Sequence, residues 1–285
     1  MSGRIVILAG GISSRMNKPD HSDDGRVVVP AGPEIKVKSM IKLGEEERPF
    51  LDYLLFNIVE AGYDDLVIVV GEHDDRIREY YSARDNSPLA ISFAVQKIPF
   101  GRRKPLGTAD ALLTALKERP DWKGTRFSIC NSDNLYSTNA LSTVKSLDYP
   151  NALIEYDRDS LGLEDDRTEK FAIMMKDKEQ FITSIMEKPS PELINEVKSK
   201  HGFVGVSMNL FSFSYEMILP CLQEVPLNPM RDEKELPDAV NIMINRNPKS
   251  LFAYPVKEQV PDLTSRSDIK IVSAYINEKY GEGII

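Results

Sequence analysis

The feature that most constrains the fold is the alternation of short apolar runs with helical patterns over the first 150 residues. Four β-branched runs, each bounded by Gly, Asp or Asn, have the length and composition of buried strands in a parallel sheet. They lie at Ile5–Leu8, Leu66–Val70, Ile91–Val95 and Phe127–Cys130. Amphipathic helical patterns over Pro49–Ala61, Thr108–Lys117 and Ser137–Leu147 separate them, with Thr108 and Ser137 as expected N-caps. This alternation predicts a doubly wound, Rossmann-like α/β sheet.

The second half of the chain follows a different pattern. Strand candidates come there without regular crossover helices between them, and helices and one more strand follow. The expected strands are Ala152–Tyr156, Phe171–Met175, Phe203–Phe213 and Leu251–Val256, and the expected helices are Tyr215–Leu222, Lys234–Ile244 and Ser267–Lys279. Because no linker separates the halves, we expect a single domain over residues 1–285 with one mixed sheet and an added substrate-facing lobe. The halves are about 1–150 and about 151–285.

Charge and cysteine content exclude several classes of function. The chain has 44 acidic and 36 basic residues and a net charge of −8, which argues against nucleic acid or an anionic membrane as a partner. The charge does not exclude a small anionic ligand bound in a local basic pocket. Cys130 and Cys221 are too few for a secreted disulfide framework, and the N-terminal apolar run is too short for a signal peptide or a membrane span. We therefore expect a soluble, cytoplasmic protein. The sequence leaves its oligomeric state open, a homo-oligomer included.

The segment Leu8–Met16, LAGGISSRM, follows the first expected strand directly. Gly10 and Gly11 leave backbone N–H groups free to hold phosphate, and Arg15 adds a cationic fork that suits phosphate oxygens. An ordinary glycine-rich turn is the alternative on the glycines alone. The segment matches neither the dinucleotide-binding nor the P-loop pattern. The polar stretch from Asn17 to Lys36 is longer than a usual strand–helix connection, and its role stays open.

Further motifs follow in a fixed order along the chain. They are Val37–Lys42, Gln96 at a strand end, Pro105–Ala111, Asn131–Asn134, Met186–Pro189, Val206–Phe211 and Val260–Thr264. With LAGGISSRM, this series resembles the sugar-1-phosphate nucleotidyltransferases, whose opening signature is LAGG-x-GTRM/L followed by PK-x-L-x-P. The resemblance covers about residues 4 to 280. Departures are Ser13-Ser14 in place of Gly-Thr, the loss of both prolines from the lysine motif, and the loss of a glycine after Asn209.

The resemblance implies a nucleotide site in the first half. Leu8, Ala9, Gly10 and Gly11 would form its phosphate-binding loop, and Arg15 and Lys38 would be the catalytic cations. Lys36 and Lys42 compete with Lys38 for that role. Gln96 and Gly107 would bind the base, which favours UTP or dTTP, and Thr108 would be a further nucleotide-binding residue.

The resemblance also implies a metal and sugar-phosphate site. Asp133 and Asp262 would hold Mg²⁺, although the tryptophan that relatives carry near the second aspartate is absent here. Glu187, Lys188 and Asn209 would bind the sugar phosphate, which makes 151–285 the sugar-binding half and 1–150 the nucleotide-binding half.

The expected activity is therefore magnesium-dependent transfer of a nucleotidyl group to a sugar 1-phosphate, with release of pyrophosphate. A glycosyltransferase of related fold is one alternative, but Asp133-Asn134-Leu135 lacks its usual Asp-x-Asp. A non-catalytic nucleotide-sugar sensor is another, and it would not need both aspartates. A molybdenum-cofactor guanylyltransferase has a similar opening, but the Glu-Lys-Pro motif and the length argue against it. Relatives that also carry an acetyltransferase or regulatory activity extend into hexapeptide repeats. Because this sequence has no such repeats, we expect the catalytic unit alone.

Overall fold

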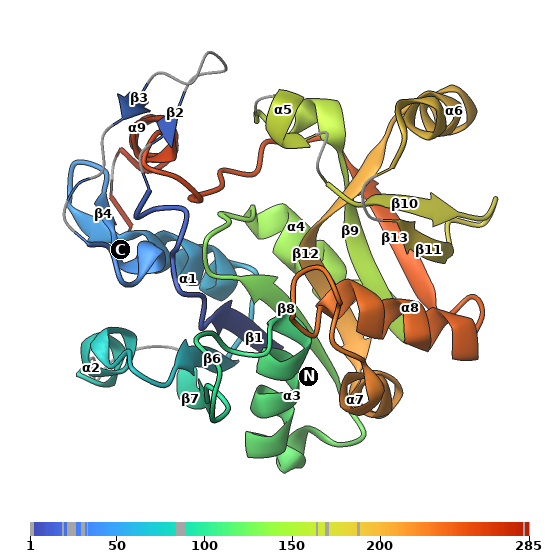
Figure 1. Ribbon diagram of the computed structural model, residues 1–285, viewed down its shortest axis with the longest axis horizontal. Helices are drawn as coiled ribbons and strands as arrows, with labels where there is room; N and C mark the ends of the chain where they lie inside the picture. Colours follow the sequence, from blue (N-terminus) through green and yellow to red (C-terminus); the bar gives the residue numbers. More distant parts are fainter. Residues whose placement is uncertain are drawn as a thin grey trace.

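A mixed β-sheet runs through the computed structural model and carries helices on both faces (Figure 1). The structure describes residues 3–18, 20–21, 27–29, 32, 34–83, 89–163, 165–168, 171–186, 189–281 and 283–284. Among these residues the sheet has nine strands. The order β11-β10-β12-β8-β1-β6-β7 forms its main path, with β9 paired to β12 and β13 paired to β9. The strands of the sheet are β1 (Arg4–Ala9), β6 (Asp65–Gly71), β7 (Ala90–Gln96), β8 (Arg126–Asn131), β9 (Asn151–Asp157), β10 (Ile173–Lys176), β11 (Ile182–Met186), β12 (Gly205–Ser214) and β13 (Leu251–Val256).

The four strands predicted in the first half are present and parallel. β1 pairs with β6 and with β8, and β6 pairs with β7, all in parallel register. β12 then pairs antiparallel with β8 and with β9, which gives the mixed sheet expected for the second half. The predicted α/β class is confirmed.

Helices of ordinary length cover the sheet. They are α1 (Phe50–Glu60), α2 (Arg76–Ser82), α3 (Thr108–Glu118), α4 (Thr138–Ser146), α6 (Pro191–His201), α7 (Tyr215–Glu224), α8 (Leu236–Arg246) and α9 (Asp268–Tyr280). Short elements complete the described chain: α5 (Asp165–Thr168), the 3₁₀ turns η1 (Lys38–Met40), η2 (Pro120–Trp122) and η3 (Arg158–Ser160), and the strand pairs β2 (Asp20–His21) with β3 (Val27–Val29) and β4 (Lys42–Leu43) with β5 (Arg48–Pro49). The sequence patterns did not predict α2, α6 or β11.

Two buried clusters, one on each face of the sheet, explain why the parallel strands are apolar throughout. In β1, Ile5 and Ile7 join the cluster under α1, α4 and α9, whereas Val6 and Leu8 join the cluster under α3, α7 and α8. Successive side chains of a strand point to opposite faces, so a sheet covered on both faces needs apolar residues at every position. The same arrangement aligns the carboxyl ends of β1, β7 and β8 at one edge, where ligands of such sheets bind.

Helix capping agrees with one of the two sequence predictions. Ser137 is the N-cap of α4, and its Oγ accepts a hydrogen bond from Ala140 N at 3.0 Å. Thr108 is not the N-cap of α3, because Gly107 occupies that position. The Thr108 hydroxyl instead accepts a hydrogen bond from Leu236 N at 2.9 Å and so connects α3 to the start of α8. Within the described residues, every helix is too short or too polar to traverse a lipid bilayer.

Candidate active site

A cavity of about 300 Å³ opens at the carboxyl edge of β1, β7 and β8. Most of the predicted site residues line it. They are Leu8, Ala9, Gly10, Gly11, Arg15, Lys38, Gln96, Gly107, Thr108, Asp133 and Asn209. Asp262 lines an adjoining cavity of about 550 Å³, and Arg15 borders both cavities. Glu187 and Lys188 lie outside the described residues.

The glycine loop that follows β1 is held by its neighbours in sequence and space. Ser13 stands where the signature has glycine and takes a left-handed φ of 50°. Its hydroxyl donates to Lys36 O at 3.1 Å and accepts from Lys38 N at 3.3 Å. These two hydrogen bonds compensate for the strain of a non-glycine residue with positive φ, and they fix the lysine segment against the loop.

The ends of the long polar stretch meet beside this loop. Asn17 Nδ2 donates to Ile35 O at 2.8 Å, and Ile35 N donates to Asn17 Oδ1 at 2.7 Å. With the Ser13–Lys36 hydrogen bond, this pair forms a neck that closes the stretch at its base. The lysine motif therefore reaches the cavity although the connection before it is long.

Lys38 is the lysine of this region that faces the predicted metal ligands. It begins η1, lines the cavity and forms an ion pair with Asp133 in which each side chain is 19% exposed. Lys36 lines a neighbouring cavity that shares Gly10 and Gly11, and Lys42 is exposed on β4. The geometry therefore favours Lys38 over its two competitors.

Asp133 and Asp262 are far apart in sequence and are brought together by backbone pairing. Leu263 N donates to Asp133 O at 2.8 Å, and Leu135 N donates to Pro261 O at 2.9 Å. Asp262 is 9% exposed; burial, and next the charge of Asp133, raise its pKa to about 6. The charge of Asp133 therefore affects the ionisation of Asp262.

An arginine that the sequence did not indicate neutralises Asp262. Arg167 of α5 donates to Asp262 Oδ2 at 2.6 Å and to Asp268 Oδ1 at 2.8 Å. The Asp262 carboxylate also accepts the Thr264 hydroxyl at 2.8 Å. Arg167 follows an acidic run, Leu163–Asp166, whose composition is typical of an exposed face, so no local signal distinguishes it.

The donor set fits a hard cation that is completed by substrate. Among the described residues, no three or more His, Cys, Asp or Glu side chains gather to form a complete metal site. Two carboxylates are nevertheless close enough for the charge of one to raise the pKa of the other, and each faces a cationic side chain. Mg²⁺ is commonly bound by one or two carboxylates, with water and substrate phosphates as the remaining ligands.

Gln96 and Gly107 line the same cavity and contact each other. Gln96 is 3% exposed at the end of β7, and its Nε2 donates to Gly107 O and to Asp110 Oδ2, each at 2.9 Å. Gly107 has a φ of 104°, and a Cβ there would lie 2.7 Å from Lys234 O. Glycine is therefore required at position 107 by both conformation and space.

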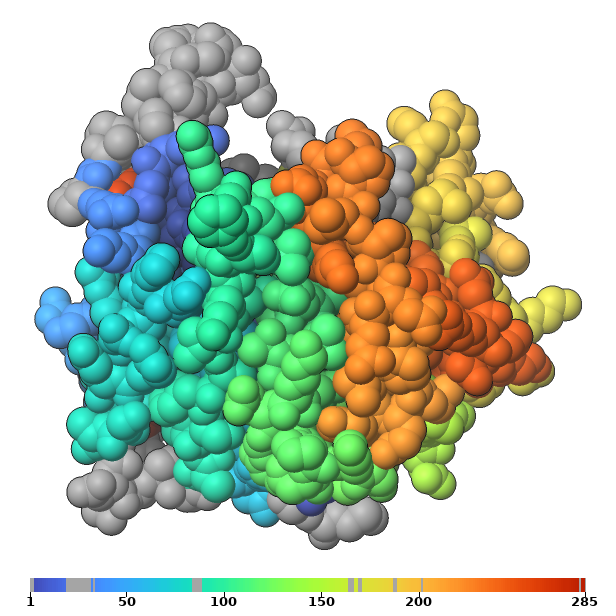
Figure 2. Space-filling model, turned by 60° about the horizontal axis from the view of Figure 1, so that its bottom comes forward, coloured from blue at the N-terminus to red at the C-terminus, as the bar shows by residue number. Residues whose placement is uncertain are grey.

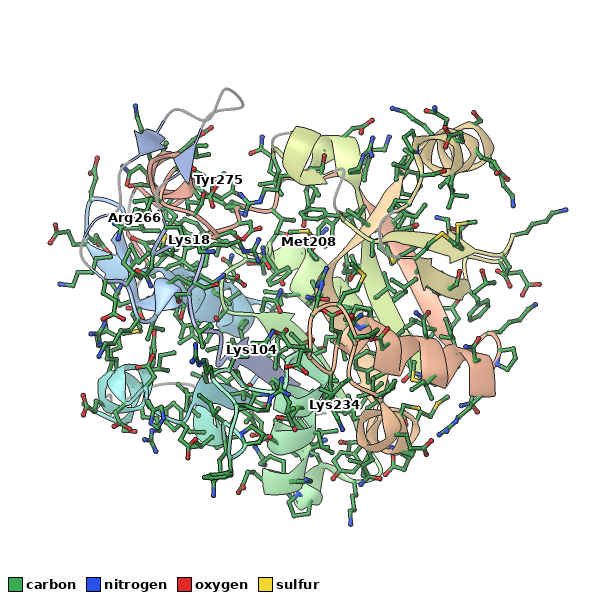
Figure 3. The ribbon with its side chains drawn as sticks, in the orientation of Figure 1. Lys18, Lys104, Met208, Lys234, Arg266 and Tyr275 are labelled. Carbon is green, nitrogen blue, oxygen red and sulfur yellow. The ribbon has the colours of Figure 1, made fainter. Side chains whose placement is uncertain are left out.

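Two loops from distant parts of the chain form one wall of the cavity. Lys104 forms an ion pair with Glu233 at 2.7 Å and Arg102 with Asp232 at 2.9 Å, and Lys104 and Glu233 both line the cavity. Figure 2 shows these segments side by side, where green meets orange, and Figure 3 labels Lys104 and Lys234 there. Each run provides counter-charges for the other, while Arg103, Arg231 and Asp232 stay exposed.

Asn209 approaches the cavity from β12. It has a left-handed φ of 59° and lies where the pairing of β12 with β9 shifts register between Ser207 and Phe211. Its backbone N–H donates to Ser207 Oγ at 3.0 Å. Asn209 lines the cavity at this irregularity of the strand. Figure 3 labels the preceding residue, Met208, near the middle of the molecule.

Comparison with known proteins gives a consistent family. The family model described as nucleotidyl transferase matches residues 34–257. The bifunctional protein GlmU of Symbiobacterium thermophilum is 31% identical over 116 residues, and that of Staphylococcus saprophyticus is 23% identical over 201 residues. These alignments cover 40% and 69% of this chain but 22% and 39% of the two relatives.

Solved structures share the fold over nearly the whole chain. A UDP-glucose pyrophosphorylase in complex with UDP-glucose superposes with a TM-score of 0.70 at 17% identity, covering 98% of this chain and all of that one. A putative glucose-1-phosphate thymidylyltransferase from Bacillus anthracis superposes with a TM-score of 0.67 at 17% identity, covering 96% and 95%. At such identities the likeness establishes the fold.

Proposed function

This chain belongs to the nucleotidyl transferase family, and we propose that it transfers the nucleotidyl group of UTP or dTTP to a sugar 1-phosphate and releases pyrophosphate. The observation that carries the proposal is a single cavity lined by the glycine loop, Arg15, Lys38 and Asp133 together with Gln96 and Gly107. The same cavity thus offers cations and amides to phosphates and an amide side chain to a base.

The reaction needs positioning and charge neutralisation more than proton transfer. A phosphate monoester has a second pKa of about 6, so the attacking oxygen of a sugar 1-phosphate is mostly ionised at pH 7. That oxygen forms a bond to the α-phosphorus as the bond to the β-phosphate oxygen breaks, and pyrophosphate leaves. This step therefore requires no general base.

Cationic side chains and backbone amides would stabilise the charge that develops on the phosphates. Arg15 and the N–H groups near Gly10 and Gly11 would neutralise the departing pyrophosphate, and Lys38 would act at the α-phosphate. Such preorganised charge commonly contributes a hundredfold or more in rate. The ion pair with Asp133 holds Lys38 in the lining of the cavity.

Asp133 and Asp262 would hold Mg²⁺. When bound, the ion supplies further neutralisation of the phosphate oxygens. Asn209 lines the cavity and would contact the sugar phosphate, together with Glu187 and Lys188. The cytoplasmic location expected from two free cysteines is part of the same proposal.

A pyrophosphate-release screen tests this function. UTP, dTTP, CTP, GTP and ATP are each combined with a panel of sugar 1-phosphates and Mg²⁺, and the nucleotide sugar is identified by mass. We expect release with UTP or dTTP and loss of release in Arg15→Ala. Arg103→Ala, which removes an exposed arginine outside the cavity lining, serves as the control and keeps full activity. Absence of release from every pair would refute the proposal.

A further inference from the structure

The Gln96 side chain is oriented by partners that can only accept hydrogen bonds. Its Nε2 donates one hydrogen bond to Gly107 O and another to Asp110 Oδ2, both at 2.9 Å. In the reversed orientation, Oε1 would face a carbonyl and a carboxylate, and both contacts would be repulsive. The amide therefore has one stable orientation, which the anionic Asp110 enforces more strongly than the neutral carbonyl does.

This orientation leaves a single type of hydrogen-bonding atom for a ligand. A Cβ at Gly10 would lie 3.1 Å from Gln96 Oε1, so the oxygen faces the glycine loop that lines the cavity. Among the described residues, no group donates to Oε1, while both Nε2 donors are used. Gln96 thus presents an acceptor to the cavity.

An acceptor at this place distinguishes bases by their ring nitrogen. Uracil and thymine carry a ring N–H at N3, and guanine carries one at N1, whereas N3 of cytosine and N1 of adenine are acceptors. An acceptor facing an acceptor leaves both unpaired, which is the strongest way for a polar site to reject a ligand.

We propose that Asp110 is a specificity-determining positioning residue, which fixes the Gln96 amide so that the site selects bases with a ring N–H, uracil and thymine among them, over cytosine and adenine. This inference rests on the proposed function, because it concerns the same nucleotide site. Among the described residues, the only side-chain partner of the Asp110 carboxylate is Gln96, in accord with such a role.

An alternative role for Asp110 is purely structural. It lies in the first turn of α3, where a negative charge stabilises a helix through the dipole. Loss of that effect would lower protein stability and weaken all nucleotides alike. Base selectivity therefore separates the two roles, and UTP and CTP are the matched pair because they have the same size.

The experiment measures the binding of UTP and of CTP by calorimetry, with Mg²⁺ and without sugar phosphate, so that it needs no turnover. We expect the wild-type protein to bind UTP at least about tenfold more tightly than CTP. In Asp110→Ala, this preference falls by roughly fivefold or more, because one of two orienting acceptors is gone. Asp110→Asn keeps an intermediate preference, because its amide oxygen can still accept. Glu118→Gln removes an exposed negative charge from the same helix and keeps the full preference.

A double-mutant comparison completes the test. In a Gln96→Ala background, Asp110→Ala changes the UTP-to-CTP ratio no further if Asp110 acts through Gln96. An unchanged ratio in the single Asp110→Ala variant, an equal change in the Gln96→Ala background, or a wild type that binds CTP as tightly as UTP overturns the inference. A wild type that binds neither nucleotide overturns the proposed function itself, and the inference with it.

Discussion

Replacing Asp262 by asparagine should stabilise the metal-free protein while removing its activity. Burial and the charge of Asp133 raise the pKa of Asp262 from 3.8 to about 6. Because the folded state then holds the proton more tightly than the unfolded state, ionisation of this carboxyl opposes folding. The resulting loss of folding stability begins near pH 4, grows as the pH rises to about 6 and stays constant above that. Two pKa units correspond to roughly 3 kcal/mol.

Asparagine cannot ionise, so Asp262→Asn avoids this loss. The substitution removes one ionic partner of Arg167, and this loss reduces the gain in stability. The loss is partial, because Arg167 keeps its ion pair with Asp268 at 2.8 Å. We expect a net stabilisation of about 1–3 kcal/mol at pH 8 and roughly half of that at pH 5. For a chain of this size, such a gain corresponds to a rise in Tm of about 2–6 °C.

Thermal unfolding in EDTA at pH 8 and at pH 5 measures both values. Addition of MgCl₂ at pH 8 should raise the Tm of the wild type and leave that of Asp262→Asn nearly unchanged, because only the wild type keeps both proposed ligands. The absence of pyrophosphate release from the variant would complete the expected result.

Asp268→Asn is the matched control, since Asp268 pairs with the same arginine. Its carboxylate also accepts hydrogen bonds from Thr264 N at 2.8 Å and Ser265 N at 2.6 Å. We expect Asp268→Asn to lower the free energy of unfolding by about 1–2 kcal/mol. If Asp262→Asn lowered the Tm at pH 8 by as much as this control does, Asp262 would be a structural partner of Arg167, and the reasoning about opposed carboxylates would be refuted.

Three further predictions concern residues that line the cavity. Arg15→Ala should reduce turnover at least about a hundredfold with an unchanged circular dichroism spectrum, and near-normal turnover would contradict its role. Lys38→Met should reduce turnover by a similar factor, whereas Lys42→Met should stay within about threefold of the wild type; the reverse order in steady-state kinetics would identify Lys42 as the working lysine. Gly107→Ala should lose at least about 2–3 kcal/mol in urea unfolding, because the residue combines a φ of 104° with a 2.7 Å approach to Lys234 O. Gly124→Ala, with a φ of 75° and open space, should lose about 1 kcal/mol, so equal losses would exclude the steric cause.

Elements whose signals are local were predictable from the sequence. The β1 strand and the LAGGISSRM loop each have a recognisable local pattern. Because the loop follows the strand directly, it must lie at the carboxyl end of that strand. The parallel strands follow likewise from short apolar runs. The closeness of Asp133 and Asp262 came instead from the order of motifs, because spacing alone does not bring together residues that are so far apart.

Contacts between residues distant in the chain were not predictable from local patterns. Arg167 follows an acidic run and has no apolar periodicity, and its partner Asp262 is 95 residues away. Arg102 and Asp232 are 130 residues apart, and each lies in a run whose composition is that of an exposed loop. Thr108 has the residue type of an N-cap, but the conformational freedom of Gly107 gives that position to the glycine.

Because of the neck at Asn17 and Ile35, the geometry of the cavity does not depend on the length of the connection. The entropy cost of closing a loop rises only logarithmically with its length, by about 0.6 kcal/mol for each doubling. Hydrogen bonds at the base fix both ends whatever lies between them. This connection is therefore a natural insertion point: a fluorescent reporter or an affinity peptide placed within it would leave Arg15 and Lys38 where they are.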